Sequence, residues 1–245
     1  MEVHAHTHTA RKKWTHYFWE FLMLFLAVFC GFLAEYKLEQ KIERHKEKEY
    51  ILSMIADLVT DTVNINTHTI YRNDRHRRLD SLSLLLRLPD YSQHTGLIYY
   101  YARWVPRNSF FNTTDRTIQQ LKNAGGMRLI TKKAASDAIL AYDAQVKIVN
   151  TQSYTLEANN TDDFTALMNN IFDGNVLDEM YGDSLLNKPT GNPRFLTNDK
   201  QKFSELITQL HWIKSLNSRN TYFESKLKIQ AVNTIQVLKK EYHLK

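Results

Sequence analysis

The sequence predicts an all-α protein, and two observations lead to that fold class. Gly and Pro are scarce, seven and four in 245 residues, which leaves few residues for the many tight turns of an all-β fold. Apolar residues recur at near-helical spacing in long segments. We therefore expect one N-terminal transmembrane helix that continues into a long amphipathic helix, followed by an antiparallel helical bundle.

The first element is an apolar segment near the N-terminus. Residues 21–34 read FLMLFLAVFCGFLA and carry no charge, but this run alone is short for a membrane span. Aromatic residues flank it on both sides, as they do at the two faces of a bilayer. Residues 17–36 would form ~30 Å of helix, the thickness of a hydrocarbon core. We predict a transmembrane helix over residues 17–36, with interfacial residues Trp14, Tyr17, Trp19 and Tyr36.

A cleaved signal peptide and a buried core helix are the alternatives for this segment. Residues 31–36 offer no clean small-x-small cleavage site, and charges resume at Glu35 within a continuing helix, which argues against cleavage. Glu20 is the one ionisable group in the span. We interpret it as an interfacial residue within reach of Lys12, Lys13 or His16, and an intramembrane ion or proton role is the alternative.

Membrane orientation follows the Lys and Arg residues close to the span. Arg11, Lys12 and Lys13 lie in a His-rich basic tail, residues 1–16, which we place in the cytoplasm. Basic residues after the span outnumber them: Lys37, Lys41, Arg44, Lys46 and Lys48. Long domains translocate largely regardless of charge, so we expect residues 37–245 to form a helical domain on the far side of the membrane.

The residues directly after the span form two charged stripes. Glu35, Glu39, Glu43 and Glu47 follow one another at i, i+4, while Lys37, Lys41, Arg44 and Lys48 gather about 150° around the helix. Like charges at this spacing repel within one helix. Parallel copies could pair the acidic stripe of one with the basic stripe of the next, with Leu38 and Ile42 between them. We predict self-association through Glu39, Glu43, Lys41 and Arg44; a solvated charged face is the alternative.

The remaining chain divides into helices and connections. No Gly or Pro lies between Tyr36 and Pro89, so the spanning helix is expected to run on as one rod. Pro89 and Pro106 bound a connector rich in aromatic residues: Tyr99, Tyr100, Tyr101 and Trp104. Thr114 or Asp115 can cap a helix that Gly125-Gly126 ends.

Two further long helices are expected. One runs from Thr131 to about Phe172 with a break at residues 157–163, where turn and capping residues cluster. The other starts at Asn198 or Asp199 and ends near Tyr242, with a weak point at residues 215–220. Between them, residues 174–198 hold three Gly and two Pro and form the long loop that we expect to contact a partner or ligand.

The sequence carries only weak candidates for chemical motifs. The sequence contains no H-E-x-x-H, G-x-S-x-G, Walker or dinucleotide-binding pattern, so we predict no catalytic residue, metal site or cofactor. Asp57 and Asp61, one helical turn apart, are interpreted as helix-face or capping residues rather than an acid–base pair. The alternating histidines His4, His6 and His8 make a weak metal site. Four close arginines are the candidates for an anion or lipid contact: Arg72, Arg75, Arg77 and Arg78.

A set of short motifs lies between residues 17 and 62: the pairs Tyr17-Phe18, Glu20-Phe21, Gly31-Phe32 and Ala34-Glu35, the run Phe25-Leu26-Ala27-Val28 with Met23, the run from Lys46 to Ile51, and Asp57-Leu58 with Asp61-Thr62. On these residues the segment resembles a family of uncharacterised single-pass membrane proteins from bacteria with an outer membrane, a domain of unknown function. The basic tail and residues 117–130 are similar to family members as well. The resemblance implies a bacterial inner-membrane location, with residues 37–245 then expected in the periplasm, and an otherwise helical domain; it brings no activity with it.

These observations favour a membrane-anchored, non-enzymatic interaction or assembly protein. The alternatives are a small accessory subunit of an ion-driven or transport complex, motivated by Glu20, and an enzyme or receptor with a pocket between residues 174–198 and the tyrosine-rich connector. Expected partners are the lipid bilayer, a protein and further copies of the chain. The net charge of +6 is spread along the sequence, and we expect no nucleic-acid partner if the domain is periplasmic.

Overall fold

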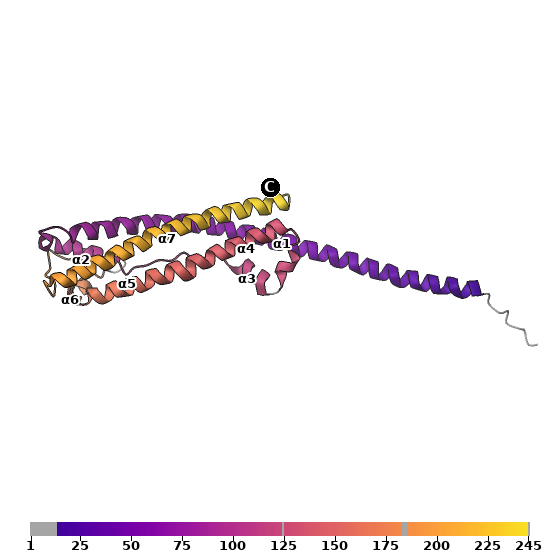
Figure 1. Ribbon diagram of the computed structural model, residues 1–245, viewed down its shortest axis with the longest axis horizontal. Coiled ribbons are helices and arrows are strands. Elements are labelled where there is room, and N and C mark those ends of the chain that lie inside the picture. Colours follow the sequence, from indigo (N-terminus) through magenta and orange to yellow (C-terminus); the bar gives the residue numbers. More distant parts are fainter. Residues whose placement is uncertain (1–13, 124, 183–185, 245) are drawn as a thin grey trace, which may run out of the picture. The chain divides into compact units, whose positions relative to one another are not determined.

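The computed structural model describes residues 14–123, 125–182 and 186–244. Within these ranges the protein is helical and contains no β-strand, which confirms the all-α prediction (Figure 1). The α-helices are α1 (Trp14–Leu85), α2 (Thr95–Trp104), α3 (Arg116–Asn123), α4 (Lys133–Lys147), α5 (Thr155–Met168), α6 (Gly174–Glu179) and α7 (Lys200–Glu241). Short 3-10 helices cover Tyr91–His94 and Gly126–Leu129, and a π-helix, η3, covers Ile148–Tyr154.

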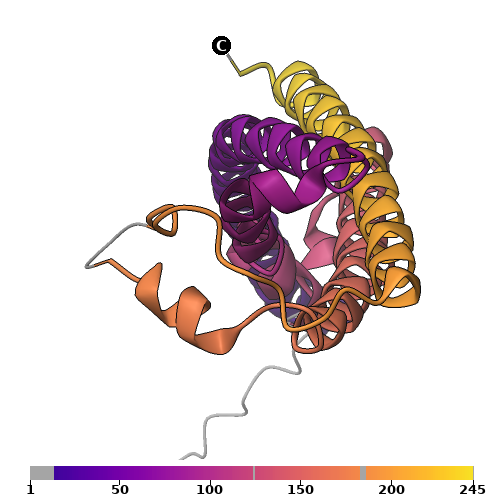
Figure 2. The same cartoon turned by 90° about the vertical axis from the view of Figure 1, so that its left-hand side faces the viewer.

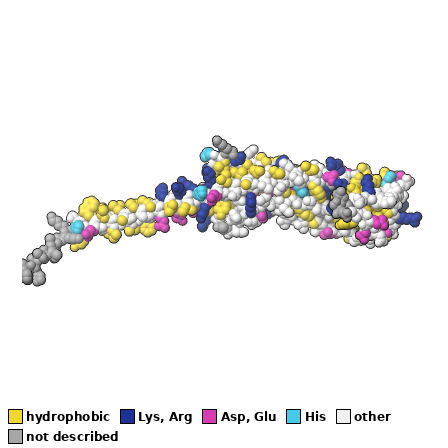
Figure 3. Space-filling view, turned by 180° about the vertical axis from the view of Figure 1, so that it is seen from behind, with side chains coloured by type: hydrophobic (Ala, Val, Ile, Leu, Met, Phe, Trp, Pro, Cys, Tyr) yellow, Lys and Arg dark blue, Asp and Glu magenta, His cyan; other side chains and the backbone are white. Residues whose placement is uncertain are grey.

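The chain divides into two compact units, residues 1–49 and 50–245. In the first unit, α1 exposes nearly all its large apolar side chains, including Phe21 at 65% and Phe32 at 67% (Figure 3). α1 is the one helix of the described chain that is long and apolar enough to cross a membrane, and none of its most apolar window is buried. The prediction of a candidate span that runs on into a longer helix is therefore confirmed.

The second unit is built from three long helical segments that lie side by side (Figures 1 and 2): α1 from residue 50, the α4–η3–α5 segment, and α7. α1 and α4–η3–α5 run in the same direction, because Asp61 contacts Tyr142 and Arg72 contacts Glu157. α7 runs antiparallel to them, since Lys214 pairs with Asp80 and Glu224 with His68.

The buried positions of these segments follow a heptad repeat, with intervals of alternately three and four residues. In α7 the repeat is unbroken: Phe203, Leu206, Leu210, Ile213, Asn217, Asn220, Glu224, Leu227, Ala231, Thr234 and Leu238. In α1 it runs as Ile51, Met54, Leu58, Asp61, Ile65, His68, Arg72, Arg75, Leu79 and Leu82, and Leu86 continues it directly after the helix. This repeat is the pattern of helices that pack knobs into holes, and it explains how three long helices share one narrow core.

The α4–η3–α5 segment carries one residue more than its heptads require. Its buried positions are regular up to Val149 and regular again from Glu157, but the two series are out of step by one residue. The π-helix between them absorbs this residue, because a π turn accommodates one extra residue without rotating the rest of the helix. The predicted break at residues 157–163 is wrong. α5 continues through it, since Glu157, Thr161 and Phe164 all pack in the core.

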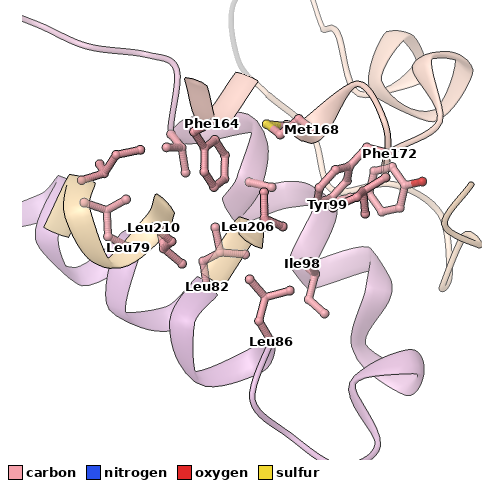
Figure 4. Close-up of a cluster of buried hydrophobic side chains, with 14 of the residues drawn as sticks. Leu79, Leu82, Leu86, Ile98, Tyr99, Phe164, Met168, Phe172, Leu206 and Leu210 are labelled. Carbon is pink, nitrogen blue, oxygen red and sulfur yellow. The ribbon is translucent and has the colours of Figure 1, made fainter. Parts of the chain in front are cut away.

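Apolar side chains form two clusters at the two ends of the second unit. One cluster contains Leu79, Leu82, Phe164, Leu206 and Leu210 together with α2 residues such as Ile98 and Tyr99 (Figure 4). The other contains Ile51, Leu58, Ile139, Leu227 and Leu238 among others. The middle of the bundle, between these clusters, is occupied by polar residues.

Residues 105–117 return along α1 from one end of the bundle toward the other. Side chains of α1 hold this return segment by its backbone: Arg75 donates to the carbonyl of Val105, Tyr71 to that of Arg107, and His68 to that of Ser109. Further along, Asp61 accepts from the amide of Thr114 and Asp57 from that of Thr117. Polar side chains on α1 therefore satisfy the backbone groups of a segment that has no regular secondary structure of its own over much of its length.

Four other features of the chain bear on the predictions. The connector between Pro89 and Pro106 contains a helix, α2. The described residues of the predicted loop, 174–182 and 186–198, include α6 and an antiparallel bridge between Tyr181 and Leu186. α7 starts as predicted, with the Asp199 side chain capping its first turn, but runs unbroken through residues 215–220, where Asn217 and Asn220 are buried. Gly125, with φ of +65°, follows the end of α3 as expected.

Candidate functional site

The most unusual feature of the second unit is a polar layer that crosses its core. It is made of heptad positions and their neighbours on all three long helical segments, and its members are buried: His68, Arg72 and Arg75 from α1, Ser153, Tyr154 and Glu157 from η3 and α5, and Asn217, Asn220 and Glu224 from α7. Each of these positions would hold an apolar residue in a simple helical bundle. The layer is the candidate functional site of the described chain.

Glu157 lies at one centre of the layer. Arg72 Nη1 is 2.7 Å from both of its carboxylate oxygens, and Arg75 Nη1 also donates to Oε1. Asn220 Nδ2 donates to Oε2 at 2.5 Å. Two guanidinium groups from one helix thus share a carboxylate from a second helix and are joined by an amide from the third. The exposed fraction of Glu157 and Arg72 is 0%, so these charges interact without solvent screening.

Glu224 is the second centre. Its carboxylate accepts from Arg72 Nε at 3.1 Å, from His68 Nδ1 at 2.8 Å and from the Tyr154 hydroxyl at 2.9 Å. Burial alone would raise the pKa of Glu224, but the His68 hydrogen bond and the charge of Arg72 outweigh burial and hold the pKa below its usual range. The same surroundings act on Tyr154 in the opposite sense, because burial and the neighbouring Glu224 charge raise the pKa of its phenol. Glu224 is therefore ionised in the folded protein.

The hydrogen bonds of His68 define its charge. Nδ1 faces the Glu224 carboxylate, and Nε2 lies 2.9 Å from the Ser109 carbonyl oxygen. A carbonyl oxygen and an ionised carboxylate can only accept, so both ring nitrogens must donate, and the ring is an imidazolium. The layer then holds three cations, His68, Arg72 and Arg75, against two carboxylates, Glu157 and Glu224. It is a charged buried network rather than a neutral one.

This arrangement fixes the alignment of the helices. Removing one member of a buried charge network leaves its partners unpaired at a cost of about 3–5 kcal/mol, so any sliding of one helix past another is strongly opposed. Four buried polar atoms of the layer have no hydrogen-bond partner in the protein: Arg72 Nη2, Arg75 Nε, Ser153 Oγ and Asn220 Oδ1. Most hydrogen bonds of the layer join its own members, as expected of a group that fixes the relative positions of the three helical segments.

Asp57 and Asp61 form a second buried polar group, nearer the start of the second unit. Asp57 accepts from the Thr117 amide at 3.2 Å and from Arg116 Nε at 2.7 Å. Asp61 accepts from the Thr114 amide at 2.7 Å and from the Tyr142 hydroxyl. Burial raises the pKa of Asp61 despite these hydrogen bonds. Both residues hold the return segment at the start of α3, so their interpretation as capping residues is confirmed.

The four arginines that sequence analysis grouped do not form one cluster. Arg72 and Arg75 are buried in the polar layer, whereas Arg77 and Arg78 face outward and pair with Asp74 at 3.2 and 2.7 Å. The helical spacing explains the separation, because residues 72 and 75 continue the inner heptad and residues 77 and 78 do not. Arg77, Arg78, Asp74, Ser81, Tyr100 and Tyr101 line a surface pocket of about 270 Å³.

The other predicted site residues lie in the first unit. Trp14, Tyr17, Trp19 and Tyr36 are exposed at 83%, 56%, 60% and 55%. Glu20 pairs with His16 at 3.1 Å. The predicted self-association residues Glu39, Lys41, Glu43 and Arg44 are exposed on α1. His4, His6, His8 and the basic residues 11–13 lie outside the described residues.

The polar layer was missed because its signal is a repeat rather than a motif. Read at intervals of three and four, the sequence places His68, Arg72 and Arg75 between Ile65 and Leu79 on one helix face. No group of three or more His, Cys, Asp or Glu in the described chain is arranged to hold a metal ion. The chain matches no family model, no curated protein and no solved structure.

Proposed function

We propose that this chain is a membrane-anchored, non-enzymatic interaction or assembly protein of the bacterial inner membrane. Its basic tail lies in the cytoplasm, and its helical domain is presented to the periplasm, where it contacts a protein partner or further copies of itself. The observation that carries the proposal is the apolar stretch of α1, whose side chains are exposed to the surroundings rather than packed against the protein. An exposed apolar helix of this length is stable in lipid and costly in water.

Two features of the second unit support a role in binding rather than catalysis. Its strongest polar site, the layer centred on Glu157 and Glu224, is buried and bonded mainly to itself, so it holds the helices in register. Its outer surface includes apolar side chains on two long helices: Val63 and Ile70 on α1, Trp212 and Ile229 on α7. Exposed apolar residues on a rigid helical frame are typical of surfaces that dock other proteins.

The test of anchoring and topology uses cysteine labelling. Cys30 is the single cysteine of the sequence, so a Cys30→Ala background allows one reporter cysteine at Ser215, an exposed position of α7. The chain should stay with membranes after alkaline carbonate extraction, and the reporter should react with a membrane-impermeant maleimide once the outer membrane is permeabilised. Release by carbonate would contradict anchoring. Labelling only after the inner membrane is broken would place the domain in the cytoplasm instead.

The accessory-subunit alternative rests on Glu20, whose carboxylate lies 3.1 Å from His16 Nε2 near the start of the apolar stretch. This pairing favours an interfacial role for Glu20.

A receptor is the second candidate function, and one contact favours it. Lys188, from the 174–198 segment, lies over the ring of Tyr100, which also lines the pocket beside Arg77 and Arg78. Anionic ligands screened against the full chain should then lose affinity in Arg77→Gln.

A further inference from the structure

α1 carries a second heptad strip on its outer face, within the second unit. The strip consists of Leu52, Ala56, Val59, Val63, Asn66 and Ile70, which follow one another at intervals of four, three, four, three and four residues. All six are exposed, with exposed fractions from 47% for Leu52 to 71% for Ile70 among the large apolar members. We call these six residues the outer strip. The inner strip of the same helix, which packs in the bundle core, has the same periodicity.

The surroundings of the outer strip carry no exposed charge on α1. Between residues 51 and 71 the charged or chargeable side chains other than Tyr71 are Asp57, Asp61 and His68, and all three are buried on the inner side. The strip is flanked instead by hydroxyl side chains, and those of Thr60, Thr62, Thr67 and Thr69 donate to the helix's own carbonyl groups. Charged residues make up 24% of the chain as a whole. A charge-free, β-branched surface is the composition of an interface core rather than of a solvated helix face.

We propose that the outer strip is the surface on which a second copy of this chain docks, in parallel. A heptad strip is complementary to an identical strip that runs alongside it, because the knobs of one helix fill the holes of the other. Asn66 points to the same occupant. Its amide is both donor and acceptor and can pair with Asn66 of an identical copy, whereas facing an apolar partner would leave it unsatisfied.

The parallel orientation rests on the proposed membrane anchor, because copies held in one membrane by the same segment share the same polarity. The sequence spacing also extends the strip toward the N-terminus through Leu38, Ile42, His45 and Glu49. Leu38 and Ile42 are the residues between the charged stripes that predict self-association. The charged stripes and the exposed apolar side chains therefore both predict self-association along the same series of α1 residues.

The size of the strip determines where pairing occurs. Residues 52–70 span ~27 Å of helix, and a helix is ~10 Å wide, so each copy offers roughly 300 Å². Stable interfaces bury about 800 Å² per partner, so the strip alone gives a weak complex in solution. Confinement to a membrane raises the effective concentration of identical copies and favours pairing there. We expect dimers in membranes and mainly monomers in dilute detergent.

The experiment compares three exposed cysteine positions on α1, two on the outer strip and one on another face of the helix. In the full-length Cys30→Ala chain, Val63→Cys or Asn66→Cys lies on the strip, and Asn64→Cys, also exposed, lies about 100° away. Oxidation in isolated membranes should give about tenfold more disulfide dimer from Val63→Cys and Asn66→Cys than from Asn64→Cys. Equal yields at all three positions, or no dimer at Val63 and Asn66, would overturn the proposal.

A second pair of variants separates the interface from the fold and from the anchor. Adding Val63→Lys to Asn66→Cys should reduce cross-linking about tenfold, because the charge is placed in an apolar seam, while adding Asn64→Lys should not. Both lysines replace exposed residues, so the melting temperature should not change. An unchanged yield of disulfide dimer with Val63→Lys would also contradict the proposal that the outer strip is the interface. Carbonate extraction of the same membranes tests the anchor separately. Release of the chain by carbonate would contradict the proposed function, whereas equal yields at the three positions in a chain that stays with the membrane would contradict the strip alone.

Discussion

The π-helix offers the most direct test of the heptad argument, through deletion of one residue. Thr151 is exposed within Ile148–Tyr154, and its removal leaves the α4–α5 segment with the number of residues that an uninterrupted heptad repeat requires. Tyr154 then occupies the heptad position between Val149 and Glu157, and both halves of the segment keep their buried faces. The π turn should convert to a regular α-helix with a change in unfolding free energy within about 1 kcal/mol.

The matched control is a deletion at the same level of the bundle in a helix with no extra residue. Deleting Ser218, exposed on α7, turns all later residues by about 100° around the helix. Leu227 and Leu238, both 0% exposed, would leave the core together with Glu224. Two leucines at about 1.5–3 kcal/mol each give a loss of roughly 3–6 kcal/mol, before any cost from the polar layer. The free energy of unfolding of a domain of this size is about 5–15 kcal/mol, so the Ser218 deletion should be severely destabilised.

Circular dichroism at 222 nm of the full chains in detergent, followed through thermal unfolding, measures both variants. The Thr151 deletion should melt within about 4 °C of the parent, and the Ser218 deletion should melt about 10 °C lower or fail to fold. A Thr151 deletion that is as damaging as the Ser218 deletion would refute the reasoning. It would mean that the π-helix is required by its own contacts and is not the accommodation of one additional residue.

Three further predictions concern single side chains. Glu224→Ala should lower the free energy of unfolding in urea by about 3–5 kcal/mol, because His68, Arg72 and Tyr154 lose their shared acceptor. The control Glu205→Ala, exposed on the same helix, should change it by less than about 0.5 kcal/mol. Equal effects of the two variants would argue against the network. Burial raises the pKa of Asp61 above 3.8, so the folded state binds this proton more tightly and stability is lost as pH rises through the raised pKa. Asp61→Asn should therefore gain stability relative to the parent as pH rises above about 4, and a difference that is constant with pH would contradict this. Gly96→Ala should destabilise the protein by about 1–3 kcal/mol and expose residues 186–198 to protease, because a Cβ would lie 2.2 Å from the Gly191 carbonyl oxygen. In the control Gly174→Ala the added Cβ has nothing within 4 Å, so stability and protease resistance should not change.

Local patterns in the sequence were sufficient for much of the fold. The aromatic-flanked apolar stretch, the long run without Gly or Pro, the Asp199 cap and the glycines after α3 each act within a few residues, and each element lies where its pattern predicts. The break predicted at residues 157–163 failed because it was read from local turn chemistry. In the folded chain the Thr161 hydroxyl donates to the Glu157 carbonyl and Phe164 is fully buried, so tertiary packing overrides the local preference.

The polar layer was not predicted because charge was taken as a sign of exposure. Arg72 and Arg75 were grouped with Arg77 and Arg78 by sequence distance, although helical spacing assigns the two pairs to different faces. Their partners Glu157 and Glu224 lie 85 and 152 residues away from Arg72, so no local reading could pair them. The heptad phase of α1 was the signal that could have placed the first two arginines in the core.

α1 is unusual in having two apolar heptad strips, and the two strips differ in a way that bears on their roles. The inner strip is interrupted by ionisable residues, Asp61, His68, Arg72 and Arg75, each paired with a specific partner on another helix or on the return segment. The outer strip has one polar residue, Asn66, and otherwise small or β-branched apolar residues and Leu52. A buried charge network fixes one arrangement of the chain with itself, because misaligned charges are expensive, whereas a short apolar strip with one amide allows reversible association. In the proposed role, the buried network keeps each copy folded independently, and the outer strip pairs copies only when they are concentrated in the same membrane.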